Sequence, residues 1–427
     1  MPHLDRYLTN PSGHFHLLAG LVALFRDAMD ALRAMPVWER GLHLFWLAGP
    51  FFLLIERTPA DAWLTIVSLA FVIRTIITRD TGWLQSLWVR AGFVFWFWCI
   101  IAGAISSAPG YSIGEALIWF RFPLFAMATA FWFGRDRRLL YAMLLSTALG
   151  LMIMCGILTA EILMIGHQNG RLSWPYGDLV PGNYVAKVGL PALVVMVALA
   201  VSIRGRLAAL SAVLALMVVI ISLFAGERIN FLILACGGLL AGLVWKPRPA
   251  RYLGLIVTGV LGSVAAGYAF PQLASRFSDK LIAGVTSFET SVWWHTLNGG
   301  WVVARDNWLF GIGTGNYRHM ALDLLEGVPF TKYDPHPHNF YLQMLVETGI
   351  IGLVLGSFFL WSIIAECFRA GLRNRGNVMI ATAFVVPLAV FWPIATSADL
   401  FGQWNNIFMW SGVALALGVC TSSPAQK

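Results

Sequence analysis

Residues 207–224 read LAALSAVLALMVVIISLF and contain no charged side chain. A helix needs roughly 20 mostly apolar residues to cross the hydrocarbon core of a bilayer, with a range of about 17–25. This stretch is therefore long enough to span a membrane as a single helix. Similar stretches recur along the chain, and they predict an all-α integral membrane protein.

The composition agrees with a membrane protein. Of the 427 residues, 58% are hydrophobic and only 12% are charged, whereas a soluble domain has roughly 25% charged residues. So few charges cannot cover the surface of a soluble protein of this size. This excludes an ordinary soluble enzyme, a disordered protein and a nucleic-acid binder built on a basic patch. The five cysteines lack the spacing of a zinc site and predict no disulfide framework.

We expect about twelve membrane-spanning helices. Prolines lie inside several of the spans and predict kinks. The first span contains Gly49-Pro50, so it is expected to be interrupted. The expected spans are residues 42–56, 61–78, 91–107, 115–133, 139–166, 184–203, 207–224, 229–245, 252–270, 348–367, 377–395 and 404–420.

The spans divide the chain into five parts. An amphipathic helix on the cytoplasmic membrane surface is expected near the N-terminus, although a plain cytoplasmic tail fits the sequence equally well. One outer loop is too long for a simple connector, which favours a functional role. The parts are residues 1–40 (N-terminal segment), 41–270 (the first nine helices), 271–347 (outer loop), 348–420 (the last three helices) and 421–427 (cytoplasmic tail).

The placement of basic residues predicts the orientation. With the N-terminus in the cytoplasm, most Lys and Arg residues between spans fall in inner loops, as the positive-inside rule requires. The loop of residues 271–347 then lies outside. The inner-loop cations are Arg79, Arg90, Arg135, Arg137, Arg138, Arg204, Arg206, Lys246, Arg248, Arg251, Arg369, Arg373 and Arg375.

Three arginines, Arg57, Arg171 and Arg228, fall in short outer loops, and the last two are the informative exceptions. Arg171 and Arg228 lie on the outer side, where topology gives no reason for a cation. The guanidinium group is permanently charged and presents a planar fork that suits phosphate. Both residues are therefore candidates for binding an anionic group. The alternative is a structural salt bridge, for example between Arg228 and Glu227.

Three charged residues fall inside expected spans, in their outer halves: Arg121, Glu161 and Lys187. Such residues are costly in lipid and usually face a cavity or one another. One interpretation is an ion pair, Arg121–Glu161 or Lys187–Glu161, that holds helices together. The other is a cationic cavity for a lipid-linked anion. The sequence leaves both open.

The densest group of polar residues precedes the tenth span, in Asp334-Pro335-His336-Pro337-His338-Asn339. Pro337 suits the first position of a helix, which would place His338 in the first turn. The helix dipole disfavours a protonated imidazole there, and a neutral imidazole is the form that a general base needs.

A polar stripe follows this histidine along the expected helix. Asn339, Gln343 and Glu347 are spaced four residues apart on an otherwise apolar helix, so they share one face. A single histidine at a helix start is usually structural. A histidine that leads a polar stripe at the outer rim of a membrane helix favours the catalytic interpretation of His338.

The run from His336 to Gly352 resembles the signature of the O-antigen ligase and polymerase superfamily, which comprises bacterial inner-membrane glycosyltransferases. Three other stretches resemble further blocks of that family. They are Gly170-Arg171 followed by Pro181-Gly182-Asn183, then Ala225-Gly226-Glu227-Arg228, and the glycine-rich stretch from Asn307 to Tyr317.

The resemblance implies a transfer reaction on a GT-C-like fold with one long periplasmic loop. A ligase of this family moves a polysaccharide from undecaprenyl diphosphate to a sugar of the lipid A-core, at the periplasmic face of the inner membrane. The sequence shows no P-loop and no Asp-x-Asp pair for a metal. We therefore expect a metal-independent, inverting reaction without a cofactor, a nucleotide or a nucleic acid.

The resemblance also assigns roles to residues. His338 would be the base that takes the acceptor proton, while Arg171 and Arg228 would bind the donor diphosphate. Many members carry a further Arg ahead of a Trp at the start of the long loop. Residues 289–295 contain no Arg, so Arg305 and Lys187 are the candidates for a third cation. The expected supporting residues are His336, Asn339, Glu347 and Arg121.

Other functions stay open. A polymerase or a protein O-oligosaccharyltransferase of the same superfamily differs in its acceptor and not in its chemistry. From another class, the chain fits a transporter or flippase of an anionic lipid. Against the transporter stand the single large outer loop and the lack of an evident internal repeat.

Overall fold

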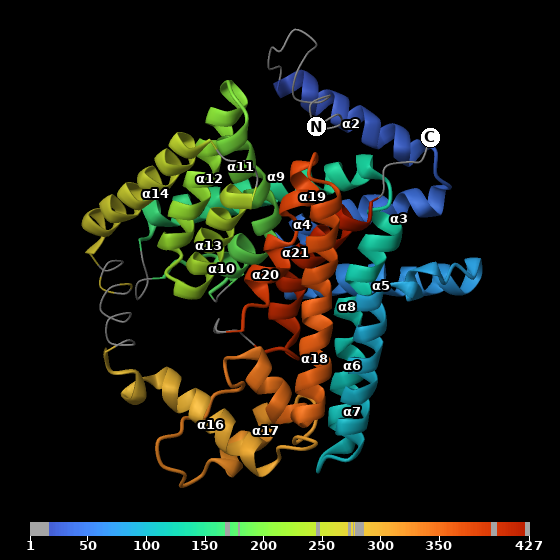
Figure 1. Ribbon diagram of the computed structural model, residues 1–427, viewed down its shortest axis with the longest axis vertical. Coiled ribbons are helices and arrows are strands. Elements are labelled where there is room, and N and C mark those ends of the chain that lie inside the picture. The colour runs from blue at the N-terminus through green and yellow to red at the C-terminus, as the bar shows by residue number, and fades with distance from the viewer. Residues whose placement is uncertain are drawn as a thin grey trace.

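The computed structural model describes residues 17–166, 171–177, 180–244, 248–271, 275, 277, 286–393 and 399–422. Gly170, Lys246, both chain ends and most of residues 272–285 lie outside the described residues. Every regular element in the described part is a helix (Figure 1). The all-α class expected from the apolar stretches is thereby confirmed.

Several helices could cross a membrane. In the part of the chain that the structure describes, seven are long and apolar enough, or eight if one bent pair counts as a single span. The seven are α5 (Arg57–Thr78), α6 (Leu87–Ala104), the run of α7 (Pro109–Trp119), α8 (Arg121–Ala128) and η2 (Thr129–Phe133), α9 (Arg137–Met164), α12 (Arg206–Phe224), α14 (Pro249–Ala269) and α18 (Phe340–Arg373). The bent pair joins α10 (Val180–Asn183) and η3 (Tyr184–Val188) to α11 (Leu190–Ser202) at an angle of 52°.

These spans are fewer than the twelve expected, because several apolar stretches are short or broken. The first expected span is divided into two helices, α3 (Val37–Leu47) and α4 (Gly49–Ile55), and Pro50 lies in the first turn of α4. The last helix begins with polar residues, including Asn405 and Asn406. The helices concerned are α3, α4, α13 (Arg228–Val244), α19 (Val378–Thr382), α20 (Val385–Val390) and α21 (Gln403–Thr421).

The remaining helices lie at the two ends of the bundle. The expected N-terminal helix is present as α2 (Leu17–Arg33), which packs against α9, while its position on a membrane surface stays a prediction. At the opposite end lie α16 (Val292–Asp306) and α17 (Tyr317–Leu324) (Figure 1). We call this end the loop end. Two short elements, η1 (Gly82–Gln85) and η4 (Phe288–Thr290), complete the set.

The core of the bundle is rich in aromatic residues. Trp46, Trp63, Trp88, Trp119 and Trp410 are all fully buried. Lipid tails are as apolar as these side chains, so close packing rather than escape from water holds such helices together. Contacts of α21 with α5, α8, η2, η3, α18 and α20 make it the central helix of this core.

The helix α18 begins before the expected tenth span and is longer. Gly349 interrupts it with a non-helical backbone (φ 67°, ψ −173°), so α18 consists of two helical segments that meet at a kink. The side chain of Asn339 caps the helix by accepting hydrogen bonds from the N–H groups of Tyr341 and Leu342, each at 3.0 Å. The expectation that Pro337 opens the helix is therefore wrong, because the side chain of Asn339 provides the cap.

Candidate active site

His338 lies immediately before the cap of α18 and not in its first turn. Its backbone is left-handed, with φ at 55°, a conformation that few residues other than glycine adopt. Its Nε2 atom is 3.3 Å from Oδ2 of Asp334, and its side chain is 39% exposed. An imidazole that is accessible and oriented by a carboxylate has the geometry of a general base.

His336 differs from its neighbour in burial. The two imidazole rings have centroids 4.3 Å apart. The Nε2 atom of His336 is buried and has no hydrogen-bond partner among the described residues. Burial, followed by the nearby charge of His338, lowers the pKa of His336 to about 4. His336 is therefore neutral at neutral pH and forms part of the wall beside His338.

Glu347 and Gly349 of the motif hold the outer loop against α18. The buried carboxylate of Glu347 accepts hydrogen bonds from the N–H groups of Gly315 at 2.7 Å and Tyr317 at 3.3 Å. Gly349 has φ at 67°, and a Cβ atom there would lie 2.1 Å from the carbonyl oxygen of Leu309. Glu347 and Gly349 therefore have a structural role, because both hold the outer loop in place. The glycine-rich stretch forms turns.

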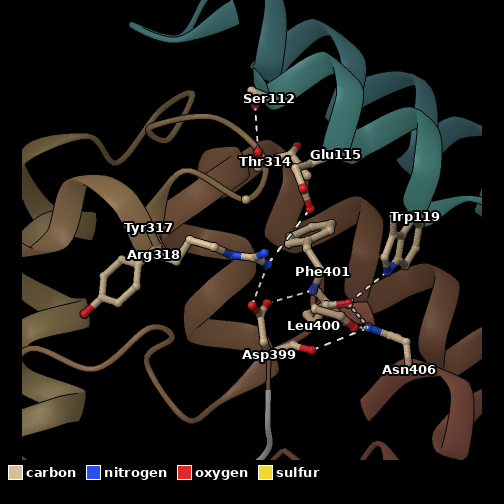
Figure 2. A network of polar contacts seen from close by, with 12 residues as sticks. Ser112, Glu115, Trp119, Thr314, Tyr317, Arg318, Asp399, Leu400, Phe401 and Asn406 are labelled. Carbon is tan, nitrogen blue, oxygen red and sulfur yellow. Dashed lines mark hydrogen bonds and ion pairs between the residues drawn. The ribbon is translucent and has the colours of Figure 1, made fainter. Parts of the chain in front are cut away.

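A polar network that the sequence did not reveal lies beside this turn. The guanidinium of Arg318, on α17, is 2.7 Å from Asp399 and 3.9 Å from Glu115 (Figure 2). The side-chain amide of Gln343 donates to Asp399 at 2.6 Å and to Glu347 at 3.4 Å. The network therefore joins α7, α17, α18 and the segment before α21. In the sequence, the only sign of this network is single charged residues in apolar stretches. Such residues do not reveal which other residues they pair with.

A second cluster contains the two exceptional arginines. Arg228 is the first residue of α13, and its guanidinium carbon lies 5.4 Å from the ring centroid of Trp293 on α16. Burial, followed by the positive charge of Arg171, lowers the pKa of Arg228. The carboxylate of Glu227 accepts a hydrogen bond from the side chain of Asn230.

Lys187 lies next to this cluster, inside the bundle. Its Nζ atom donates to the side-chain oxygens of Asn183, at 2.7 Å, and Asn405. Asn183 also accepts a hydrogen bond from Asn230 at 3.3 Å, which connects Lys187 to the helix of Arg228. The lysine belongs to a π-helical turn, a feature frequent at functional sites.

Neither expected ion pair of Glu161 forms. One oxygen of Glu161 accepts hydrogen bonds from the backbone N–H groups of Ser173 at 2.9 Å and Trp174 at 3.0 Å. Arg121 pairs instead with Asp61 at 2.8 Å and joins α8 to α5. Glu161 therefore holds the segment that carries Arg171, while Arg121 stabilises the packing of two helices.

The helix α16 connects the cationic cluster to the histidines. Trp293 lies at its start, against Arg228, whereas a Cβ atom on Gly300 would be 2.7 Å from Pro337. Seven residues of helix separate these two contacts by about 10 Å. Arg305 lies about 18 Å along the helix from Trp293. It is 66% exposed and pairs with Asp306 at 3.1 Å, so the structure does not bring it to the cluster.

Residues 191–356 match the family model described as O-antigen ligase. This match supports membership in the O-antigen ligase superfamily. The family indicates a glycosyltransferase-type enzyme that acts on polysaccharides and lipid-linked substrates. Together with the apolar helices, it identifies a multi-pass membrane protein.

The matched segment contains both Arg228 and His338, whereas Arg171 and Asp399 lie outside it. No curated protein matches the sequence. One similar solved chain comes from a peptidoglycan synthase complex, with 17% identity and a TM-score of 0.46, covering 78% of this chain and 96% of that chain.

Proposed function

We propose that the protein is an O-antigen ligase. It would move O-antigen polysaccharide from undecaprenyl diphosphate to a lipid A-core sugar, at the periplasmic face of the bacterial inner membrane, in lipopolysaccharide biosynthesis. The observation that supports this most is the contact of α16 with both clusters. Through Trp293 it meets Arg228, and near Gly300 it meets Pro337 in the loop of His338, so α16 connects the candidate base to one of the candidate cations.

The proton transfer in this proposal begins at His338. With Nε2 facing Asp334 at 3.3 Å, Nδ1 would accept the proton of the acceptor hydroxyl. The hydroxyl oxygen then forms a bond to the anomeric carbon of the donor glycan as the bond to the diphosphate breaks. A single displacement of this kind inverts the configuration. Asp334 stabilises the imidazolium that results.

The departing diphosphate would be bound by Arg171 and Arg228. Cations placed where negative charge develops lower the barrier of such a step. Two guanidinium groups in proximity repel each other in the free protein, and an anion between them relieves this repulsion. Lys187 would add positive charge from within the bundle. Arg305 lies too far along α16 to be the third ligand, so Lys187 is the better candidate of the two.

One assay tests the proposal and separates it from its rivals. Purified protein in nanodiscs is mixed with undecaprenyl-diphosphate-linked glycan and lipid A-core, and the products are separated on a gel. A ligase yields lipid A-core of increased mass. A polymerase lengthens the lipid-linked glycan without using the core, a protein O-oligosaccharyltransferase modifies a protein, and a transporter forms no new covalent bond. Any of these three results in place of core modification would refute the ligase.

A further inference from the structure

An apolar pocket lies among α11, α12, α13 and α14. Its volume is about 280 Å³. Two hydroxyl groups occur on its lining residues, and both are engaged in the protein: Ser263 donates to the carbonyl of Gly259 at 2.8 Å, and Tyr252 donates to that of Leu239 at 2.9 Å. The pocket therefore offers packing surface without free polar groups, which selects for a hydrocarbon.

The pocket is within reach of the bilayer. The helix α14 lies at the outer edge of the bundle (Figure 1), and Ala266 is its one buried residue. Apolar side chains of α14 point away from the protein, with Leu253 60% and Leu261 63% exposed. In a membrane this surface faces lipid, so a chain in the bilayer meets the pocket beside α14 without passing through water.

One stripe of α13 joins the pocket to the cationic cluster. Phe231, Ala235, Gly238 and Leu239 line the pocket from this helix. Residues three and four apart on a helix are neighbours on one face, so Arg228 continues the stripe one turn above Phe231. The pocket thus begins about one turn from the guanidinium that would bind the donor diphosphate.

We propose that this pocket holds part of the polyprenyl chain of the donor. The inference rests on the proposed function, because it takes the diphosphate to lie on Arg228. A ligand with a diphosphate at Arg228 and a hydrocarbon chain that follows α13 passes directly into the pocket. An apolar cavity of about 150 Å³ holds one benzene molecule, so the observed volume suits roughly two five-carbon isoprene units.

Filling the pocket tests the proposal. A Cβ atom on Gly238 would meet Val197 at 3.6 Å and one on Gly259 would meet Leu216 at 3.5 Å, both ordinary contacts, so Gly238→Leu and Gly259→Leu place new side chains in the pocket. Gly254→Leu is the matched control, because a Cβ there meets nothing within 4 Å and Gly254 is exposed on the same helix as Gly259. The measurement is the Kd of each variant in nanodiscs for undecaprenyl diphosphate and for inorganic diphosphate.

We expect both pocket variants to bind undecaprenyl diphosphate on the order of three- to tenfold more weakly, because a chain that moves from lipid to protein gains packing alone. Their Kd for inorganic diphosphate should stay unchanged, and Gly254→Leu should change neither value. Unchanged binding of undecaprenyl diphosphate in both pocket variants would overturn the chain site. If the wild-type protein binds neither diphosphate, the proposed function itself fails.

A second measurement does not depend on the folding of the variants. A polyprenyl diphosphate with a diazirine on its isoprene units nearest the diphosphate is photolysed with the wild-type protein, and labelled peptides are identified by mass spectrometry. Labels on α12, α13 and α14 support the site. Labels confined to other helices would place the chain elsewhere and overturn it.

Discussion

Replacing Arg228 is the sharpest test of the donor site. This residue lies at the start of α13 with its guanidinium over Trp293, and the charge of Arg171 reaches it. A hydrogen bond to a charged group contributes about 1.5–3 kcal/mol. Since about 1.4 kcal/mol corresponds to a factor of ten in affinity, we expect Arg228→Ala to bind undecaprenyl diphosphate roughly ten- to a hundredfold more weakly.

The geometry of the guanidinium predicts a second result. Arg228→Lys keeps the positive charge and loses the planar fork that binds phosphate through two parallel bonds. Its affinity should therefore fall between those of Arg228→Ala and the wild type. Arg305→Ala is the matched control, since Arg305 is a cation of the same loop end that is 66% exposed and paired with Asp306.

The assay measures binding of undecaprenyl diphosphate and of lipid A-core separately, for the wild type and the three variants. We expect weaker donor binding in both Arg228 variants, unchanged acceptor binding, and no effect of Arg305→Ala. Weaker acceptor binding with unchanged donor binding would refute it. The diphosphate site would then have to be sought at other cations, beginning with Lys187.

Four further outcomes are expected. His338→Ala should lower the transfer rate by about 10²–10⁴-fold, as expected for a lost general base, while donor binding persists. His336→Ala should lower the rate less. Near-normal product formation by His338→Ala would exclude the base role. Activity should survive EDTA, and a collapse that magnesium or manganese reverses would contradict a metal-independent reaction. Glu161→Ala should release the segment of Arg171 and raise the KM for the donor more than it lowers kcat. Glu161→Gln should have a milder effect because it keeps an acceptor oxygen. Equal effects on both constants would argue that Glu161 does not position Arg171. Gly349→Ala should lower the Tm, because its left-handed backbone costs another residue about 1–3 kcal/mol; an unchanged Tm would show that the loop adapts.

The class of fold was predictable from composition and apolar length. A backbone in lipid must satisfy its own hydrogen bonds, so stretches such as residues 207–224 have essentially one solution, the helix. The long helices α5, α9 and α12 were expected close to their observed bounds for this reason. Breaks and helix starts were less predictable, because a single side chain such as that of Asn339 decides where a helix begins.

For the candidate site too, the sequence identified some features and not others. His338, Arg171 and Arg228 stood out in the sequence because each is a polar group where topology or apolar pattern gives no reason for one. Their surroundings depend on residues far apart in the chain. The ion pair of Arg318 with Asp399 joins positions 81 residues apart, and that of Arg121 with Asp61 joins positions 60 apart.

The sequence by itself therefore determined the helical membrane class and the identity of the candidate groups, since both are local properties of the chain. The tertiary structure alone decided which charges meet, that Glu161 holds the segment of Arg171, and that α16 contacts both Arg228 and the loop of His338. The physical reason is that apolar length and periodicity report the backbone conformation of one segment. Ion pairs and buried hydrogen bonds depend on how separate helices pack, which no single segment encodes.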